Sequence, residues 1–468
     1  MKHWAKFFLS SAIVLGLAGC MVGPNYKRPA VTVPDAYRAA PEISATTPDK
    51  SASLSDQKWE EVFQDKQLQE LLRTALRQNY DVRIAAARIL EAQAQLGITR
   101  ADQFPTLDVG GTMVNQQSAA NGPIPSFEQT KGQVTASAAW QLDFWGRYRR
   151  ATEAARANLL ASEWARREVI TTLIANVAAG YYQLRQFDLQ LEIAKRTAGS
   201  RNDSLQLTKT LQEHGANSML DVRQAEQLVY TATEQIPDLE RRIEQEENAL
   251  SILLGNNPGA IARGLKLTEQ PHAPEVPAGL PSALLERRPD IRQAEQQLVA
   301  ANAQIGVARA AFFPQITLTG SAGFQSSALT SLFTGPSGLW SMAGSLTQPI
   351  FQGGRLTSNL HLTQAQRDEA VLFYQKTIQG AFRDVSDALV GYRKNREFRE
   401  QQELLTQSAQ DAARLSEIRY KAGESSYLEV LTNETNYFTA ELGLAQAQGN
   451  ELVSLVQLYQ SLGGGWQQ

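Results

Sequence analysis

The chain has 468 residues, of which 43% are hydrophobic and 20% charged, and 45 basic against 48 acidic side chains leave a formal net charge of −3. This near balance, without a basic patch, gives no indication of nucleic-acid binding. The only cysteine is Cys20, which excludes a disulfide within the chain and, once acylated, thiol chemistry as well.

Residues 1–19 are predicted to be a secretory signal peptide. Two lysines precede a short apolar stretch, which is too short to span a bilayer. It ends in Leu-Ala-Gly-Cys, which resembles a bacterial lipobox, so we expect cleavage before Cys20 and lipidation of that residue. The alternative is an ordinary signal peptide with an incidental cysteine. Met21 stands where an aspartate would retain such a lipoprotein in the inner membrane, which favours the outer membrane, and an extended, lipidated arm is predicted at 20–55.

Two segments at about 105–116 and 132–144 show the period of two that marks β-strands. Leu107, Val109 and Met113, for example, alternate with Asp and Thr or Gly. Strands of about ten residues with one apolar face fit transmembrane strands, and the alternative is a small soluble sheet with one buried face. No later stretch of about eighteen apolar residues follows, and one lipid anchor binds a membrane only weakly. We therefore expect the strands to hold the chain in the bilayer.

The distribution of proline predicts long helices. None of the 18 prolines lies between Pro125 and Pro237, and none follows Pro349. Both intervals are rich in strong helix formers, so helices are predicted at about 147–213 and 217–254. The first alone would be ~100 Å long at 1.5 Å per residue, which exceeds a globular domain and suits a rod.

The second half of the chain repeats the first. The stretch HGANSMLDVR, which contains Gly215 and Asp221, returns 208 residues later as AGESSYLEVL, which contains Gly423 and Glu429. We predict a tandem duplication. Its parts are a first repeat at 56–257, a linker at 258–281 and a second repeat at 282–465, with strands at about 315–325 and 340–351 and long helices at about 355–421 and 426–461.

Four strands per chain predict an oligomer. Only helices and closed barrels satisfy every backbone hydrogen bond inside a bilayer, and the smallest barrels need about eight strands. Several chains must therefore pool their strands, and long amphipathic helices likewise bury their apolar stripes against neighbours. The sequence predicts a mainly α protein with a transmembrane β part that assembles into a tube.

Several long motifs identify a family. The motifs are LPSALLERRPD at 280–290, TQPIFQGGR at 347–355, LGGGW at 462–466 and the spacing Cys-x3-Pro-x-Tyr-x2-Pro that opens at Cys20. Together they resemble the TolC-like outer-membrane factors, in particular the lipoprotein branch that works with resistance–nodulation–division (RND) multidrug efflux pumps. The resemblance covers nearly the whole chain.

The resemblance implies a homotrimer. It would form a twelve-stranded β-barrel in the outer membrane, continued by a coiled-coil α-helical barrel through the periplasm. An equatorial domain would include the linker at 258–281. The implied partners are outer-membrane lipid, a periplasmic adaptor (membrane fusion) protein and an inner-membrane RND transporter.

The expected function is passive conduction of drugs or other small solutes from the periplasmic assembly to the outside. The chain contains no phosphate-binding loop, nucleophile elbow or zinc-protease motif, so we expect neither enzyme activity nor a cofactor, and its scattered histidines suggest no metal site. The alternatives are a duct for a type I protein exporter, a metal-efflux duct, which the few Met and His residues do not favour, and a non-conducting trimeric stalk.

The repeated stretch is the candidate gate. Gly215 and Gly423 each interrupt a long predicted helix and mark a helix–turn–helix tip. In the family such tips close the periplasmic end, and Tyr420 falls where the family keeps a gating tyrosine. Threefold symmetry would gather Asp221 and Glu429 into acidic rings; the alternative is that both are solvated first-turn residues favoured by the helix dipole.

The two tips are predicted to be unequal. Tyr420 corresponds to Gln212 in the first repeat, so the latch is expected on the second tip. Thr432 stands where some members of the family carry a further aspartate, which leaves the acidic ring incomplete.

Overall fold

The computed structural model describes residues 21–37, 53–123, 125–271 and 281–466. The predicted signal peptide, the lipidation site Cys20, part of the predicted arm and residues 272–280 of the predicted linker lie outside these residues. Within the described part the chain is mainly helical with one four-stranded sheet, which confirms the predicted fold class. None of the described helices combines the length and the apolar character that a membrane crossing requires.

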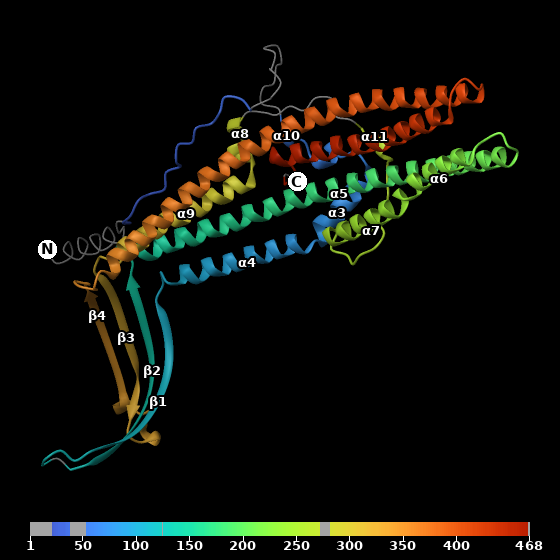
Figure 1. Ribbon diagram of the computed structural model, residues 1–468. Helices are drawn as coiled ribbons and strands as arrows, with labels where there is room; N and C mark the ends of the chain where they lie inside the picture. The colour runs from blue at the N-terminus through green and yellow to red at the C-terminus, as the bar shows by residue number, and fades with distance from the viewer. Residues whose placement is uncertain (1–20, 38–52, 124, 272–280, 467–468) are drawn as a thin grey trace. The chain divides into compact units, whose positions relative to one another are not determined.

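Both halves of the chain have helices, then two strands, then a 67-residue helix followed by a returning helical segment, although the first half contains two helices more (Figure 1). The first half contains α2 (Trp59–Val62), α3 (Lys66–Gln78), α4 (Tyr80–Ala101), β1 (Thr106–Ser118), β2 (Phe127–Leu142), α5 (Arg147–Glu213), α6 (Met219–Thr233) and α7 (Gln235–Leu253). The second half contains α8 (Pro281–Arg287), α9 (Pro289–Ala310), β3 (Gln315–Ser326), β4 (Gly338–Thr347), α10 (Arg355–Lys421) and α11 (Tyr427–Ser461). The helices α5 and α10 each have 67 residues.

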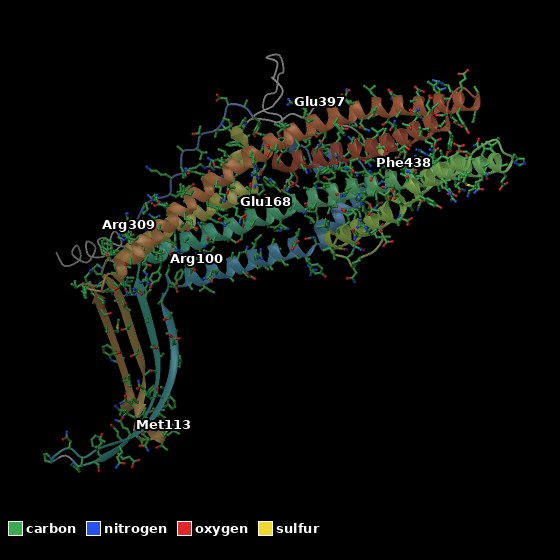
Figure 2. The ribbon with its side chains drawn as sticks, viewed as in Figure 1. Arg100, Met113, Glu168, Arg309, Glu397 and Phe438 are labelled. Atoms are coloured by element: carbon green, nitrogen blue, oxygen red, sulfur yellow. The ribbon has the colours of Figure 1, made fainter. Side chains whose placement is uncertain are left out.

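The strands form an antiparallel meander in the order β1-β2-β3-β4. Directly opposed residues share a face of a sheet, and the register aligns the apolar positions across all four strands. Two such rows are Leu107–Ala138–Gly320–Met342 and Val109–Ala136–Ala322–Trp340. Met113 lies on the same face (Figure 2). In the single chain its side chain is 72% exposed and that of Met342 is 83% exposed, so a large apolar surface is left uncovered.

Two strand ends differ from the prediction. The strand β2 begins at Phe127 and not near residue 132, because its first residues pair with the polar end of β1, where no apolar alternation marks a strand. The strand β4 ends at Thr347 and not near residue 351. Pro349 follows, and proline cannot donate a hydrogen bond to a strand ladder.

The helix predicted at about 217–254 is wrong as a single element. It is divided at Glu234 into α6 and α7. Pro237 has no backbone N–H for the carbonyl of Thr233, and its ring crowds that carbonyl, so α6 ends there and a new helix begins.

The described residues divide into two compact units, each considered by itself. One unit contains the sheet, Arg88–Glu163, Gln293–Gln375 and the arm up to Ala30. Within it, both guanidinium nitrogens Nε and Nη2 of Arg28 donate to the carboxylate of Glu295 at 2.6 Å, and Tyr26 adds a hydrogen bond at 3.2 Å. Such bidentate pairs are among the stronger polar contacts in proteins, so the described arm is fastened to α9.

The other unit contains the hairpins and consists of Val31–Ala87, Trp164–Arg292 and Lys376–Gln468. Its core joins distant segments, because Phe63 is fully buried and its ring meets those of Tyr182 and Tyr459 edge to face, at 6.4 and 5.8 Å. This unit holds the candidate gate residues.

Candidate functional site

Both hairpin tips are built by the same backbone motif. Gly215 and Gly423 have φ of 76° and 75°, a conformation that glycine adopts without strain. After α5, the N–H of Gly215 bonds to Gln212 and that of Ala216 to Leu211. After α10, Gly423 bonds to Tyr420 and Glu424 to Arg419 in the same way. These are Schellman caps, so both glycines end a long helix as the sequence predicts.

Asp221 is committed to its own helix. Ser218 caps α6, its hydroxyl accepts the N–H of Asp221 at 3.3 Å, and the Asp221 carboxylate accepts the Ser218 N–H at 2.8 Å. This reciprocal capping box satisfies two of the free N–H groups at the helix start. The geometry therefore gives Asp221 a structural role within one chain.

Glu429 has a different environment, although it corresponds to Asp221 in the repeat. Ser426 caps α11 without a side-chain hydrogen bond, and Glu429 instead lies 3.6 Å from Arg419 at the end of α10. Both side chains are more than one-third exposed, so the pair contributes little to stability. Its carboxylate is available for contacts outside the chain.

Tyr420 joins the two tips. Its hydroxyl accepts a hydrogen bond from Nδ2 of Asn217 in the first tip at 3.3 Å, and its ring centroid lies 5.2 Å from that of Tyr427. Tyr427 packs against the buried cluster of Leu205, Val222 and Ala225, and burial raises the pKa of its hydroxyl. We call Asn217, Tyr420 and Tyr427 the tip contact. The structure thus brings Tyr420 to the first tip and not to Glu429.

A buried arginine of α5 precedes the first tip in the chain. Arg201 of α5 is 4% exposed; it donates to the carbonyl of Leu228 in α6 at 2.8 Å and to that of Glu434 in α11 at 3.3 Å. Its guanidinium also lies 4.9 Å from the ring of Phe438 of α11. Burial lowers its pKa, an effect that the Glu434 carboxylate opposes. Arg201 therefore connects three helices, and nothing in the sequence distinguishes it from other basic residues in a helix.

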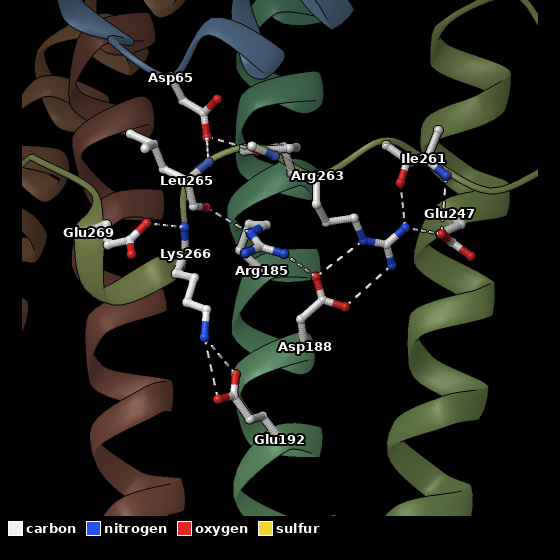
Figure 3. Close-up of polar contacts among 12 residues, drawn as sticks. Asp65, Arg185, Asp188, Glu192, Glu247, Ile261, Arg263, Leu265, Lys266 and Glu269 are labelled. Carbon is white, nitrogen blue, oxygen red and sulfur yellow. Dashed lines mark hydrogen bonds and ion pairs between the residues drawn. The ribbon is translucent and has the colours of Figure 1, made fainter.

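A second polar cluster fastens the linker to the helices (Figure 3). Asp65 caps α3 through Oδ1, and its Oδ2 accepts hydrogen bonds from Tyr181 at 2.8 Å, Gln270 at 2.9 Å and the N–H of Leu265 at 3.0 Å. Burial opposes ionisation of Asp65, but the hydrogen bonds from Gln270, Tyr181, Gln67 and Leu265 outweigh it and hold its pKa below the usual range. We call Asp65, Tyr181, Leu265 and Gln270 the linker network.

Further ion pairs extend this cluster along α5 and α7 (Figure 3). Arg263 in the linker pairs with Asp188 of α5 at 3.2 Å and with Glu247 of α7. Arg185 pairs with the same Asp188 at 2.6 Å and donates to the Leu265 carbonyl at 3.0 Å. The linker is thereby held against two helices, and the sequence reasoning missed all of these contacts.

Neither cluster has the composition of a metal centre. In the ranges that the structure describes, no three His, Cys, Asp or Glu side chains are arranged to hold a metal ion. What the tips offer is one side-chain hydrogen bond between the two hairpins, from Asn217 to Tyr420, and a weak ion pair within the second hairpin, between Arg419 and Glu429.

Comparison with known proteins gives a consistent result over the whole chain. The family model described as outer membrane efflux protein matches the chain twice, over residues 71–256 and 280–464. The toluene efflux pump outer membrane protein TtgC of Pseudomonas putida is 39% identical over 460 residues, which cover 97% of this chain and 94% of that protein. The cation efflux system protein CusC of Escherichia coli is 34% identical over 463 residues, which cover 98% and 99%.

Solved structures agree with the sequence relatives. The open state of the MtrE outer membrane channel of Neisseria gonorrhoeae matches with a TM-score of 0.86 at 32% identity, covering 96% of this chain and 99% of that one. A structure of CusC matches with a TM-score of 0.86 at 32% identity, covering 95% and 100%.

Proposed function

The chain belongs to the outer membrane efflux protein family, and from that premise we propose that it is the outer-membrane exit duct of a tripartite efflux pump. It is an outer-membrane protein, as its relatives are. The observation that carries the proposal is the sheet, whose apolar positions align in register on one uncovered face. A face of this kind suits contact with lipid.

The assembly is proposed to be a homotrimer. Among the described strands, β1 and β4 have no neighbour on their outer edges, and unpaired backbone groups are costly in a bilayer. Three chains would supply twelve strands and close the sheet on itself. The helices α5 and α10 would then line up as a periplasmic tube.

The proposed partners are a periplasmic adaptor and an inner-membrane RND transporter, which would supply the energy. The names of the relatives mention efflux of toluene, antibiotics, solvents and cations, although each relative is similar in sequence to this chain. Selection of the solute is therefore assigned to the pump and not to this chain. An N-terminal lipid on Cys20 is part of the proposal, and mass spectrometry of the mature N-terminus tests it.

The tip contact is proposed to be part of the periplasmic gate. Tyr420 connects the second hairpin to the first through Asn217 and Tyr427, so its loss would free one tip from the other. Glu429 is proposed to act between chains, because its ion-pair partner among the described residues, Arg419, holds it only weakly. Asp221 would contribute to the electrostatic field at the tip while it continues to cap α6.

Single-channel recording in a planar bilayer tests both the proposed duct and the proposed gate. A duct passes current, whereas a structural stalk passes none. The double variant Tyr420→Phe, Glu429→Ala should raise the resting conductance. Tyr437→Phe, which removes a hydroxyl from α11 outside the tip contact, should leave it unchanged. Resting current equal to wild type in the double variant would refute the gate and leave the duct standing.

A further inference from the structure

Four arginines mark the places where the strands are joined to the helices. Each lies five to eight residues from the helix-side end of its strand: Arg100 before β1, Arg147 after β2, Arg309 before β3 and Arg355 after β4. The first and third correspond between the two repeats, as do the second and fourth. Arg100 and Arg309 are labelled in Figure 2. All four belong to the unit that contains the sheet, and we call them the junction arginines.

The junction arginines have no carboxylate within 4 Å among the described residues. Arg355 donates to the side-chain oxygen of Gln352 at 2.7 Å, and Arg147 lies 5.7 Å from the ring of Tyr148. Arg147 is partly exposed and the other three are exposed. Their positive charges are therefore not compensated within the part of the chain that the structure describes.

The neighbouring charges are already engaged with one another. Arg149 pairs with Asp143 at 3.4 Å and Arg150 with Glu153 at 2.7 Å. In the segments that join strands to helices, at 97–105, 143–150, 307–314 and 348–356, Asp102 is the one other acidic residue. Each chain thus carries an excess of positive charge at the end of its sheet.

The helix dipoles do not explain the shared position of the four arginines. Arg100 and Arg309 lie in the last turns of α4 and α9, where a positive charge is favourable. Arg147 and Arg355, however, are the first residues of α5 and α10, whose first turns contain no acidic residue, and a positive charge is unfavourable there. What the four share is their distance from the sheet.

The N-terminal arm indicates which side of α9 Arg309 occupies. The arm is fastened to Glu295, and its Pro24 carbonyl accepts a hydrogen bond from Nδ2 of Asn302 at 3.0 Å. Glu295, Asn302 and Arg309 follow one another at intervals of seven residues, so they lie on one stripe of the helix. A lipid on Cys20 reaches the bilayer only from outside the proposed tube, so this stripe faces outward.

The junction lies at the expected boundary of the membrane. The arm begins here, because the N–H of Val22 donates to the carbonyl of Trp145 at 3.1 Å. Ile350 and Phe351, between β4 and Arg355, are 89% and 88% exposed. Apolar side chains beside basic ones are typical of a membrane interface. The headgroup layer adds roughly 5–8 Å to each side of the hydrocarbon core, a depth that an arginine side chain can reach.

We infer that the junction arginines bind the phosphate groups of anionic phospholipids, in the leaflet on the helix side of the sheet. The inference rests on the proposed insertion of the sheet into the bilayer. A guanidinium group forms paired, charge-assisted hydrogen bonds with phosphate. A zwitterionic headgroup brings its own ammonium group to the same place, so the excess of positive charge favours anionic lipid. Three chains would present a belt of twelve arginines.

Electron spin resonance of spin-labelled lipids tests the inference on the mature protein in phosphatidylcholine vesicles. At low salt, labelled phosphatidylglycerol should associate with the protein about fivefold more strongly than labelled phosphatidylcholine does. This preference should fall toward one in about 1 M salt, because exposed charges are then screened.

Substitutions connect the preference to these side chains. The fourfold variant (Arg100→Gln, Arg147→Gln, Arg309→Gln, Arg355→Gln) should show no preference, and lysine at the same four positions should retain most of it. If the fourfold variant does not assemble, the pair Arg100→Gln, Arg309→Gln should reduce the preference to about twofold. The matched variant is Arg88→Gln, at an exposed arginine of α4 that lies twelve residues further from the sheet, and it should behave as wild type does.

Equal association of the two labelled lipids with the wild-type protein would overturn the inference. So would an undiminished preference in the pair or fourfold variant, or a loss in Arg88→Gln as large as that in the pair. The amount of labelled phosphatidylcholine held by the protein reports insertion, and single-channel current reports the duct. Failure of the junction arginines as a lipid site is therefore distinguishable from failure of the proposed function.

Discussion

Asp65 offers the sharpest test of how the linker is held. Its carboxylate is 1% exposed, with Oδ1 bound to the N–H groups of Gln67 and Leu68 and Oδ2 to Tyr181, Leu265 and Gln270. The substitution Asp65→Asn keeps the shape of the side chain but replaces one carboxylate oxygen with an NH2 group. If the remaining oxygen still caps α3, the new NH2 group faces three donors.

The magnitude follows from the hydrogen bonds that are lost. The Tyr181 hydroxyl can rotate and accept from the new NH2 group, since it already accepts the Gly264 N–H at 2.8 Å and has a second lone pair. The Leu265 N–H then has no acceptor, Nε2 of Gln270 keeps only the Leu265 carbonyl at 3.2 Å, and a hydrogen bond to a charged group contributes about 1.5–3 kcal/mol. We expect local opening of the linker to become easier by about 3 kcal/mol, which is roughly a hundredfold in rate of exchange.

Hydrogen–deuterium exchange of a peptide that contains the Leu265 amide measures this directly. Tyr181→Phe should give a smaller acceleration: it removes the hydrogen bonds of the Tyr181 hydroxyl with Asp65 and with the Gly264 N–H, but it leaves the charged carboxylate that accepts the Leu265 N–H. Asp238→Asn makes the same chemical change on α7 at a carboxylate paired only with nearby arginines on the surface, and it should leave the linker unchanged. Unaltered exchange at Leu265 in Asp65→Asn would refute the reasoning.

Three further predictions concern pH and packing. The pKa of Asp65 is depressed in the folded protein, so its ionised carboxylate stabilises the fold above the ordinary value of about 4, and this stabilisation is lost as the pH falls through the lower folded value. Exchange of the Leu265 amide, corrected for its intrinsic rate, should therefore accelerate only in that acidic range. Acceleration above about pH 5 would contradict the assignment. Burial raises the pKa of Glu434, so Glu434→Gln should raise the apparent Tm at neutral pH. The gain should shrink as the pH falls toward about 4.5, because the native glutamate then becomes protonated. A gain that does not depend on pH would contradict this account of Glu434. A Cβ at Gly264 would lie 2.2 Å from Oδ1 of Asp65, so Gly264→Ala should destabilise by about 2 kcal/mol, whereas Gly199→Ala, with nothing within 4 Å, should be neutral or stabilising in the same thermal melt.

The long elements could be predicted because their signals are local. A segment without proline and rich in helix formers, between Gly146 and Gly215, marks α5, and both of these glycines have positive φ. The alternation of apolar and polar residues predicted which face of each strand would be apolar, and the register agrees. The wrong prediction of one helix for α6 and α7 also has a local cause. Pro237 lies within the predicted helix, and a proline breaks the hydrogen bond of the preceding turn.

The contacts of the site could not be predicted, because they join residues far apart in the chain. Asp65 meets Leu265 across 200 positions and Asn217 meets Tyr420 across 203, and no pattern within either segment indicates its partner. The capping role of Asp221 can be predicted from the sequence, since a serine three residues before an acidic residue marks a helix start. Tyr427, which seats Tyr420 against the helices, was missed because an aromatic residue at a helix start has no distinctive spacing.

The open edges of the sheet have a consequence for biogenesis. Strands β1 and β4 each have one neighbour among the described strands, so in the proposed trimer a newly exported chain cannot complete its own fold, and productive insertion competes with edge-to-edge aggregation. The rate of closure then depends steeply on the number of chains present, as in any assembly governed by mass action. Coexpression of a variant that assembles but cannot conduct would be dominant negative, because with equal amounts of both chains only about one trimer in eight would be wholly wild type.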